Sequence, residues 1–267
     1  MSSKTVFFVD IDGTLVGADF FLNEEVIQAA KEYQKSMGRL VLCTGRSVYG
    51  TKHIADKLGV SAPAILYNGA VIYDFCQEKI LWKRPLDRGI MEIIRRIYKE
   101  RPEVCIEIFT EERIYRIRTN WMVENRGVPE ERGILYPEIP QIKEDILKIT
   151  LIADHSAELK ECRGYFNGGF SFEFSGRHFA EIVREGCGKH IAAKELIKYA
   201  KLNPEVIFAA GNGQNDMELL RQSDYAFVPV TAEEKVRQVA DYLIDSPKEC
   251  GMKKAFETAA ACRAVPE

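Results

Sequence analysis

The chain has 267 residues, of which 46% are hydrophobic and 29% charged, a composition typical of globular proteins with a sizeable core. Its 37 Lys and Arg residues nearly balance its 40 Asp and Glu residues, so there is no overall positive field to hold a nucleic-acid backbone. No apolar run approaches the roughly 20 residues of a membrane helix or the ~7–15 of a secretory signal. These features predict a cytoplasmic protein that binds neither nucleic acid nor membrane.

Strand and helix signals alternate in the first 75 residues, which predicts βαβ units and a parallel sheet with helices on both faces. An apolar strand over Thr5–Val9 stops at Asp10. The spacing of Val26, Ala30 and Tyr33 predicts an amphipathic helix that begins after Asn23. Further along, we predict strands over residues 39–43 and 64–66 and a helix over 47–58.

In the middle of the chain the regular alternation of strand and helix signals stops, which predicts an α+β insertion over residues 84–184. We expect a helix that follows Asp87 and runs to about Lys99 and another over 156–166, with strands over 105–109, 113–117, 147–153, 170–174 and 179–183. The βα alternation then returns with a helix over 190–201, a strand over 206–210, a helix over 216–221 and a strand over 225–228. Thr231 and Glu234 match a T-x-x-E capping box. The predicted organisation is a core domain formed by residues 1–83 and 185–267, the two segments that flank the insertion in the sequence.

Two carboxylates, Asp10 and Asp12, directly follow the first strand. Side chains two residues apart at a strand end project to the same side, and open α/β sheets bind ligands beyond the carboxyl ends of their strands. Because like charges this close need a cation or a shared proton, the pair is a candidate Mg²⁺ site. The alternative is a turn with solvated acidic side chains.

Asp10-Ile11-Asp12-Gly13-Thr14-Leu15 resembles the DxDGTL signature of the haloacid dehalogenase (HAD) superfamily of phosphotransferases. Three other segments resemble the family's second, third and fourth motifs, in the expected order: residues 42–46, the pair Gly188-Lys189, and residues 211–216. The insertion between the second and third motifs, with Asn68-Gly69-Ala70 ahead of it, is most similar to the Cof-type subgroup with a C2 cap. The resemblance covers essentially the whole chain and implies a Rossmann-like, doubly wound parallel sheet with a mobile cap domain over the site.

The resemblance also implies a mechanism. Asp10 would be the nucleophile that forms an aspartyl-phosphate, and Asp12 the general acid and base. Electrostatic stabilisation of the phosphoryl group would come from Lys189 and Thr44. The phosphate-binding positions implied are Gly45, Arg46 and Asn215, and the Mg²⁺ ligands implied are Asp10, Asp12, Asn212 and Asp216.

Each residue also has a simpler interpretation. Lys189 alone would be read as a solvated surface lysine, Thr44 as a helix cap, and Arg46 as the partner of an acidic residue. The sequence also departs from the family pattern at Asn212, where relatives carry an acidic metal ligand. An amide oxygen can coordinate a hard cation without contributing negative charge, so we expect either weaker metal binding or compensation by a neighbour such as Asp216.

The function predicted is a Mg²⁺-dependent phosphatase acting on small phosphorylated metabolites, with sugar phosphates foremost. A weakly active relative that binds a phosphometabolite and a sugar phosphomutase are the alternatives. A two-component receiver domain shares the acidic pair but needs only about half this length. The physiological substrate and the oligomeric state stay open.

Overall fold

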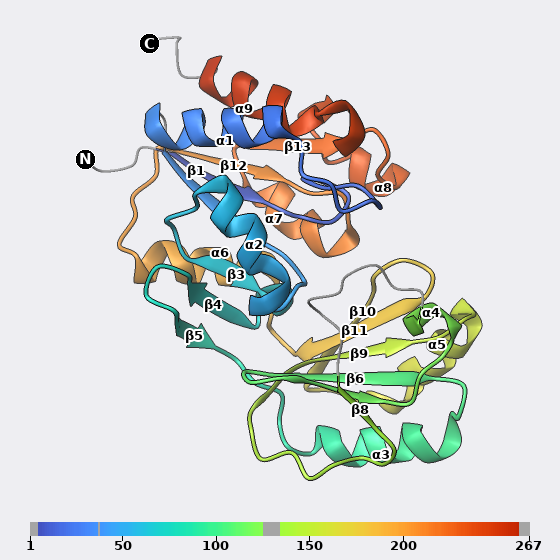
Figure 1. Ribbon diagram of the computed structural model, residues 1–267. Helices are drawn as coiled ribbons and strands as arrows, with labels where there is room; N and C mark the ends of the chain where they lie inside the picture. Colours follow the sequence, from blue (N-terminus) through green and yellow to red (C-terminus); the bar gives the residue numbers. More distant parts are fainter. Residues whose placement is uncertain (1–4, 37, 125–133, 262–267) are drawn as a thin grey trace. The chain divides into compact units, whose positions relative to one another are not determined.

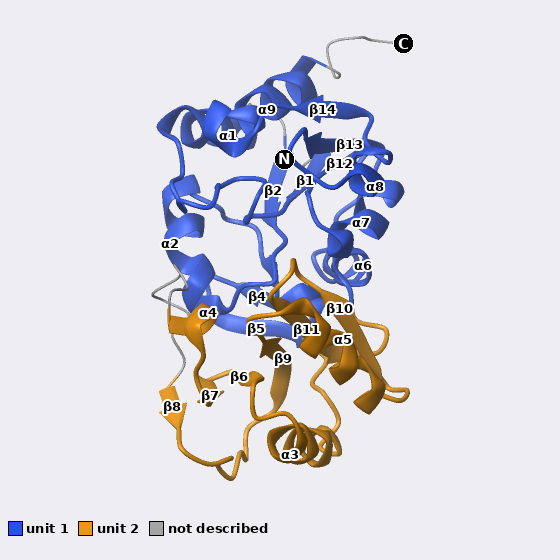
Figure 2. Cartoon of the chain, turned by 90° about the vertical axis from the view of Figure 1, so that its right-hand side faces the viewer, with its two compact units in different colours: residues 1–82, 188–267 blue, residues 83–187 orange. Residues whose placement is uncertain are grey.

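The computed structural model describes residues 5–36, 38–124 and 134–261, which fall into two compact units. Unit 1 combines the two ends of the chain, residues 1–82 and 188–267, and unit 2 is the segment between them, residues 83–187 (Figure 2). The limits of unit 2 lie within three residues of the insertion predicted over 84–184. Each unit has its own sheet and its own hydrophobic cluster.

A five-stranded sheet runs through unit 1 in the order β14-β13-β12-β1-β2, and all of its pairings are parallel (Figure 1). Every residue of β1 is buried, as expected for a strand that is covered on both faces. The strands are β1 (Thr5–Val9), β2 (Gly38–Leu42), β12 (Val206–Ala210), β13 (Tyr225–Pro229) and β14 (Tyr242–Ile244).

Alternate side chains of β1 contact helices on opposite faces of this sheet. The ring of Phe7 packs against Tyr33 of α1 and Phe256 of α9, with ring centroids 5.7 and 5.2 Å apart. Phe8 instead joins the cluster that contains Leu196 of α6. This is the predicted doubly wound arrangement. The helices of unit 1 are α1 (Glu24–Ser36), α2 (Val48–Leu58), α6 (Lys189–Tyr199), α7 (Met217–Gln222), α8 (Glu234–Arg237) and α9 (Gly251–Ala261).

A second, smaller sheet takes up the strand predicted at residues 64–66. It has the order β3-β4-β5, formed by β3 (Ala64–Leu66), β4 (Val71–Asp74) and β5 (Lys79–Lys83). β3 pairs antiparallel with β4, and an isolated parallel bridge from Cys43 to Ile65 connects it to the end of β2. The strand predicted over residues 64–66 is confirmed, but it pairs along its length with β4 and not with the parallel strands of the main sheet, which the sequence pattern did not reveal.

Unit 2 is built on a six-stranded sheet with helices on both faces: α3 and α5 cover the Ile-rich face, and Val123 of α4 packs with Cys105 and Ile152 on the other. Ile90, Ile94 and Ile97 of α3 recur at helical spacing and pack with Ile108 and Ile149 of the sheet. The strand order is β10-β11-β9-β6-β7-β8, antiparallel except for the pair β7 and β8. The elements are α3 (Ile90–Glu100), β6 (Cys105–Thr110), β7 (Ile114–Ile117), α4 (Trp121–Glu124), β8 (Ile134–Tyr136), β9 (Ile146–Ile152), α5 (Ser156–Cys162), β10 (Phe170–Phe174) and β11 (Phe179–Arg184).

On the other face of the same strands, buried polar and charged side chains lie in a row across the sheet. The Nε and Nη2 atoms of Arg116 donate to Oε1 of the fully buried Glu107 at 2.9 and 2.7 Å. Lys148 Nζ lies 2.7 Å from Oε1 of Glu181. Thr150 is in register with both glutamates, and its buried hydroxyl has no hydrogen-bond partner among the described residues. The Ile-rich face of the sheet thus forms the hydrophobic core of unit 2. The buried charges on the other face are compensated by pairing with one another.

Arg116→Ala is expected to lower the free energy of unfolding by about 3–5 kcal/mol, because it removes the guanidinium that compensates a fully buried carboxylate. Urea unfolding followed by circular dichroism measures the loss. Arg96→Ala is the matched control: Arg96 pairs with Glu100 at the surface of α3, and removing it should cost about 0.5 kcal/mol or less. Equal losses in the two variants would contradict the buried-pair account.

Two predicted helix ends differ from those in the structure. The helix predicted over 156–166 ends at Cys162 and continues as a 3-10 turn over Arg163–Tyr165. Thr231 does not cap α8, whose N-cap is Glu233. Ala232 N–H donates to the Pro229 carbonyl and closes a turn, so the chain enters the helix two residues later than the T-x-x-E pattern implies.

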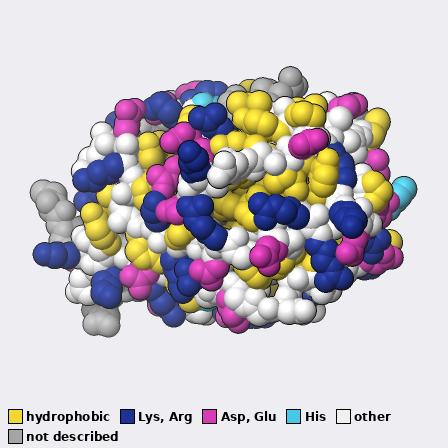
Figure 3. Space-filling view, turned by 90° about the horizontal axis from the view of Figure 1, so that it is seen from below, with side chains coloured by type: hydrophobic (Ala, Val, Ile, Leu, Met, Phe, Trp, Pro, Cys, Tyr) yellow, Lys and Arg dark blue, Asp and Glu magenta, His cyan; other side chains and the backbone are white. Residues whose placement is uncertain are grey.

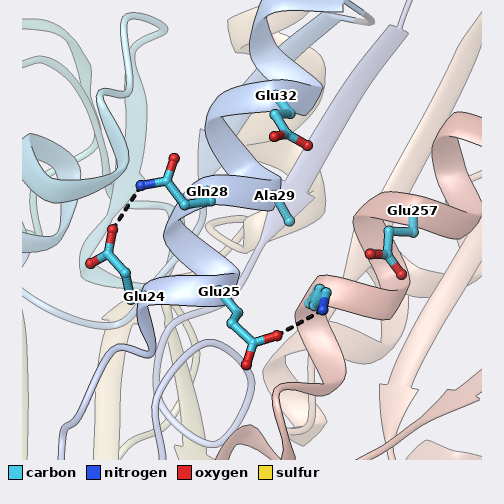
Figure 4. A pocket seen from close by; sticks show the side chains of 7 residues that line it. Glu24, Glu25, Gln28, Ala29, Glu32 and Glu257 are labelled. Carbon is cyan, nitrogen blue, oxygen red and sulfur yellow. Dashed lines mark hydrogen bonds and ion pairs between the residues drawn. The ribbon is translucent and has the colours of Figure 1, made fainter.

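One face of the surface carries charged side chains of both signs (Figure 3). On the face in Figure 3, acidic and basic side chains are interspersed rather than gathered by sign. A hollow of about 260 Å³ between α1 and α9 is lined by Glu24, Glu25, Gln28, Ala29, Glu32, Lys253 and Glu257 (Figure 4). Its four glutamates make it unsuited to a phosphate group. Within the described part of the chain, every helix is too short or too polar to cross a bilayer.

Candidate active site

Three adjacent parallel strands bring the predicted motifs to one edge of the main sheet. Val9 of β1 is in register with Leu42 of β2 and with Ala210 of β12. The loops that follow these strands therefore begin side by side at the carboxyl edge, where open α/β sheets bind ligands. Asp10 lies at the start of the first loop, Thr44 in the second, and residues 211–216 form the third.

Lys189 is the buried centre of this edge. It is the first residue of α6, its side chain is 1% exposed, and its Nζ lies 2.6 Å from Oδ1 of both Asp10 and Asp216. The interpretation as a solvated surface lysine is wrong. A buried ammonium is stable here because two carboxylates compensate the loss of hydration.

The same cluster shifts the ionisation of its members. Burial raises the pKa of Asp10 to about 7; the Lys189 ammonium opposes this shift, and the charges of Asp216 and Asp12 add to it. Burial acts to lower the pKa of Lys189, but Asp10 and Asp216 together hold it above its ordinary value. Lys189 therefore stays charged, while two buried carboxylates share its single positive charge.

Asp216 holds the third loop as well as Lys189. Its Oδ2 accepts hydrogen bonds from the backbone N–H groups of Asn212 and Gly213 at 3.0 and 2.9 Å, while its Oδ1 faces Lys189. Both carboxylate oxygens are engaged by protein donors. The geometry gives Asp216 an orienting position rather than an open ligand position.

Asp12 and Arg46 form a two-pronged ion pair across the first two loops. Arg46 Nε lies 2.8 Å from Asp12 Oδ2, and Nη2 lies 2.6 Å from Oδ1. Arg46 is nearly buried, its Nη1 donates to the Gly50 carbonyl, and its guanidinium lies 5.5 Å from the Phe20 ring centroid. The Asp12 side chain is 48% exposed, so it faces solvent from a fixed position. Of the alternatives for Arg46, the described contacts support the ion pair.

Thr44 does not cap the following helix. Ser47 is the N-cap of α2, and its Oγ accepts a hydrogen bond from Gly50 N–H at 3.1 Å. The Thr44 hydroxyl instead accepts from the N–H of Arg46 at 3.2 Å. Gly45 lies between Thr44 and Arg46 in the same loop. The Thr44 hydroxyl thus stabilises the turn of its own loop at the edge of the sheet.

Asn215 reaches this loop through a residue to which the sequence analysis assigned no role. Asn215 Nδ2 donates to Asn68 Oδ1 at 3.0 Å, and the backbone N–H of Asn68 donates to the Thr44 carbonyl at 3.1 Å. A Cβ on Gly69 would lie 2.3 Å from the Gly188 carbonyl oxygen, so the start of α6 packs directly on this glycine. The Asn68-Gly69 pair directly after a strand could have indicated this tight turn from the sequence, because both residues tolerate the positive φ found there.

Asn212 faces the oxygens of the first loop. One atom of its side-chain amide lies 2.9 Å from the Asp12 carbonyl oxygen and 3.3 Å from Asp10 Oδ2. It is also 3.3 Å from Thr14 Oγ1. The described residues contain no group of three His, Cys, Asp or Glu side chains placed to hold a metal. Any cation at this edge would instead be held by one carboxylate, one backbone carbonyl and one amide, which are the hard oxygen donors that Mg²⁺ prefers.

Comparisons with known proteins agree with this architecture. The sequence profile of the haloacid dehalogenase-like hydrolases matches residues 7–256. The phosphoglycolate phosphatase of Methanopyrus kandleri is 25% identical over 246 residues, which cover 89% of this chain and 89% of that protein. A haloacid dehalogenase-like hydrolase from Bacteroides thetaiotaomicron has a TM-score of 0.84 at 19% identity, covering 96% of this chain and 99% of that one. A HAD subclass IIB sugar phosphatase has a TM-score of 0.81 at 21% identity, with coverages of 96% and 99%.

Proposed function

Because this chain belongs to the family of haloacid dehalogenase-like hydrolases, we propose that it is a Mg²⁺-dependent phosphatase of small phosphorylated metabolites, with sugar phosphates foremost. The observation that carries the proposal is the buried Asp10–Lys189–Asp216 cluster at the carboxyl edge of the parallel sheet. A phosphoglycolate phosphatase and a sugar phosphatase among the similar proteins support the substrate class.

In the proposed reaction, an oxygen of Asp10 attacks phosphorus and forms an aspartyl-phosphate as the bond from phosphorus to the leaving oxygen breaks. For Asp12 to act as the general acid, one of its oxygens must leave the Arg46 guanidinium, take up a proton and donate that proton to the leaving oxygen. Asp12 then accepts a proton from water, which attacks phosphorus and releases inorganic phosphate with regeneration of the Asp10 carboxylate. The half-exposed carboxyl group of Asp12, in the loop that begins at Asp10, suits a group that exchanges protons with a substrate or water.

The remaining residues of the edge would stabilise charge on the phosphoryl oxygens. Lys189 contributes a permanent positive charge beside Asp10, and the Thr44 hydroxyl, the Gly45 amide and the Asn215 amide are the proposed hydrogen-bond donors. Asp216 keeps Lys189 in place and orders the third loop. Because these groups are held by the fold before substrate arrives, little reorganisation is needed during transfer.

The donor set fits a Mg²⁺ ion. Asp10 Oδ2, the backbone carbonyl of Asp12 and the amide oxygen of Asn212 are the proposed direct ligands, with Asp216 acting on them through the loop backbone. When bound, the ion would neutralise negative charge on the phosphoryl group. The two-pronged contact of Arg46 orients the Asp12 side chain, so that its backbone carbonyl stays directed toward Asn212.

A screen of phosphate release from a panel of sugar phosphates and other phosphorylated metabolites tests the proposal. Reactions contain either Mg²⁺ or a chelator. We expect turnover of several substrates with Mg²⁺ and its loss with the chelator. If no substrate releases phosphate but one binds, the second candidate gains: a weakly active relative that binds a phosphometabolite, which the uncharged Asn212 favours.

Asp12→Asn is expected to lower kcat by about 10²–10⁴-fold with little change in KM, because it removes proton transfer and leaves the phosphate-binding groups in place. Steady-state kinetics on the best substrate of the screen give both constants. Asp56→Asn, an exposed aspartate of α2, controls for the loss of one surface charge and should retain activity. Should Asp12→Asn turn over like the unmodified chain, another residue must serve as the acid.

A further inference from the structure

The side-chain amide of Asn212 has two orientations that differ in chemistry but not in shape. Rotation by half a turn exchanges its oxygen and nitrogen while the rest of the residue stays in place. In either orientation, one of these atoms lies 2.9 Å from the Asp12 carbonyl oxygen and 3.3 Å from Asp10 Oδ2. Those two neighbours accept hydrogen bonds when Asp10 is ionised, so the two orientations have very different energies.

With the nitrogen turned toward the first loop, the two N–H groups of the amide have three acceptors within reach: the Asp12 carbonyl, Asp10 Oδ2 and Thr14 Oγ1. The amide then bridges the first and third loops without any cation. The partial positive charge of the amide N–H groups faces the Asp10 carboxylate, on the opposite oxygen from the one that Lys189 contacts. A metal-free site is thereby held together by the chain itself.

With the oxygen turned toward the first loop, three oxygens converge. Lone pairs of the amide then face the Asp12 carbonyl and Asp10 Oδ2 without a proton between them, which is unfavourable unless a cation joins them. Octahedral Mg²⁺ has metal–oxygen distances of about 2.0–2.1 Å, so neighbouring ligands lie about 2.9 Å apart. The separations of 2.9 and 3.3 Å match this spacing with a small contraction.

We propose that Asn212 is a two-position switch: its amide nitrogen takes the place of the divalent cation in the metal-free protein, and its amide oxygen is a ligand in the metal-bound protein. The inference rests on the proposed function only in placing Mg²⁺ at this edge. Metal binding must break the bridging hydrogen bonds and rotate the amide. The bridge therefore stabilises the metal-free protein and lowers its affinity for the metal. An aspartate at this position could not make the bridge, because it would add a third carboxylate beside Asp10 and Asp216.

The aspartate variant tests the switch by stability and direct binding rather than by activity. Asn212→Asp is expected to unfold at a lower temperature than the unmodified chain in chelator, and to gain more thermal stability from MgCl₂ alone. Calorimetric titration with MgCl₂ should show at least about tenfold tighter binding by the variant. Gln214→Glu adds the same charge to an exposed position of the same loop and should leave the Mg²⁺ affinity nearly unchanged.

Side-chain amide NMR of the unmodified chain provides an independent readout if the variant does not fold. The Asn212 NH₂ resonances, assigned by selective labelling, should exchange slowly with water in chelator and exchange faster once MgCl₂ is added. Equal thermal and calorimetric responses of the two chains, or Asn212 resonances insensitive to Mg²⁺, would overturn the switch. A chain that shows the switch but releases phosphate from no substrate would refute the proposed function and leave the switch standing.

Discussion

Asp10→Asn is expected to abolish phosphate release, with kcat lowered by about 10⁴–10⁶-fold, because an amide cannot replace the carboxylate as the attacking group. The substitution is nearly isosteric, and the contact between Lys189 and Asp216 remains to hold the edge. Phosphate release from the best substrate of the screen measures the loss. Asp74→Asn replaces another buried aspartate of unit 1 that lies at the end of β4, and it should retain activity.

The same variant should fold at least as stably as the unmodified chain in metal-free buffer. Burial raises the pKa of Asp10 to about 7 from an ordinary value of 3.8, so the folded chain binds this proton more tightly than the unfolded chain. Stability contributed by the protonated group is therefore lost as the pH rises from about 4 to 7. Urea unfolding should show that Asp10→Asn exceeds the unmodified chain in free energy of unfolding by more at pH 8 than at pH 5.

The activity measurement can contradict the role of Asp10. Substantial phosphate release by Asp10→Asn would show that another residue is the nucleophile.

The gathering of the motifs at one sheet edge could be predicted because it depends on strand burial and direction alone. β1 is a continuous apolar run, and its predicted bounds, Thr5–Val9, are those observed. Parallel strands necessarily present their carboxyl ends together. A polar residue that ends a buried strand is therefore placed correctly without any knowledge of its partners.

The contacts inside the site could not be predicted in the same way. The two-pronged pair of Arg46 with Asp12 spans 34 residues, and the Lys189 contact with Asp10 spans 179. Local periodicity contains no information on such pairs, and charge counting leaves each lysine or arginine with many possible partners. The burial of Lys189 depends on two carboxylates that arrive from different loops, so its sequence neighbours indicated only a helix start.

Short elements were missed for a different reason. β14 spans Tyr242–Ile244, too short for an alternating pattern, and its three residues pair with Phe227–Pro229 of β13. α9 begins at Gly251, which lacks the usual capping chemistry and whose Cβ position lies 1.9 Å from the Asp245 carbonyl oxygen. Tertiary packing therefore determines β14. α9 is rich in Ala, Lys, Met and Glu, which favour helix, so it was missed because its start carries no capping signal.

Lys189→Met is expected to lower the free energy of unfolding by about 3–5 kcal/mol at pH 8, because it leaves Asp10 and Asp216 buried together without their shared cation. Methionine has a similar length and fills the same space, so the loss reports the charge rather than a cavity. Urea unfolding measures it. Lys194→Met, on the exposed side of α6, is the control and should change stability by about 0.5 kcal/mol or less.

Two further measurements separate charge from shape at this position. The loss in Lys189→Met should shrink at pH 5, because without the ammonium a buried carboxylate is stabilised by binding a proton, and acidic groups with a raised pKa contribute stability at low pH. The double variant Lys189→Met/Asp10→Asn should recover part of the loss at pH 8, since one of the two uncompensated charges is gone. A loss that is independent of pH and strictly additive with Asp10→Asn would show that Lys189 supports the fold by packing, and that the two carboxylates do not depend on its charge.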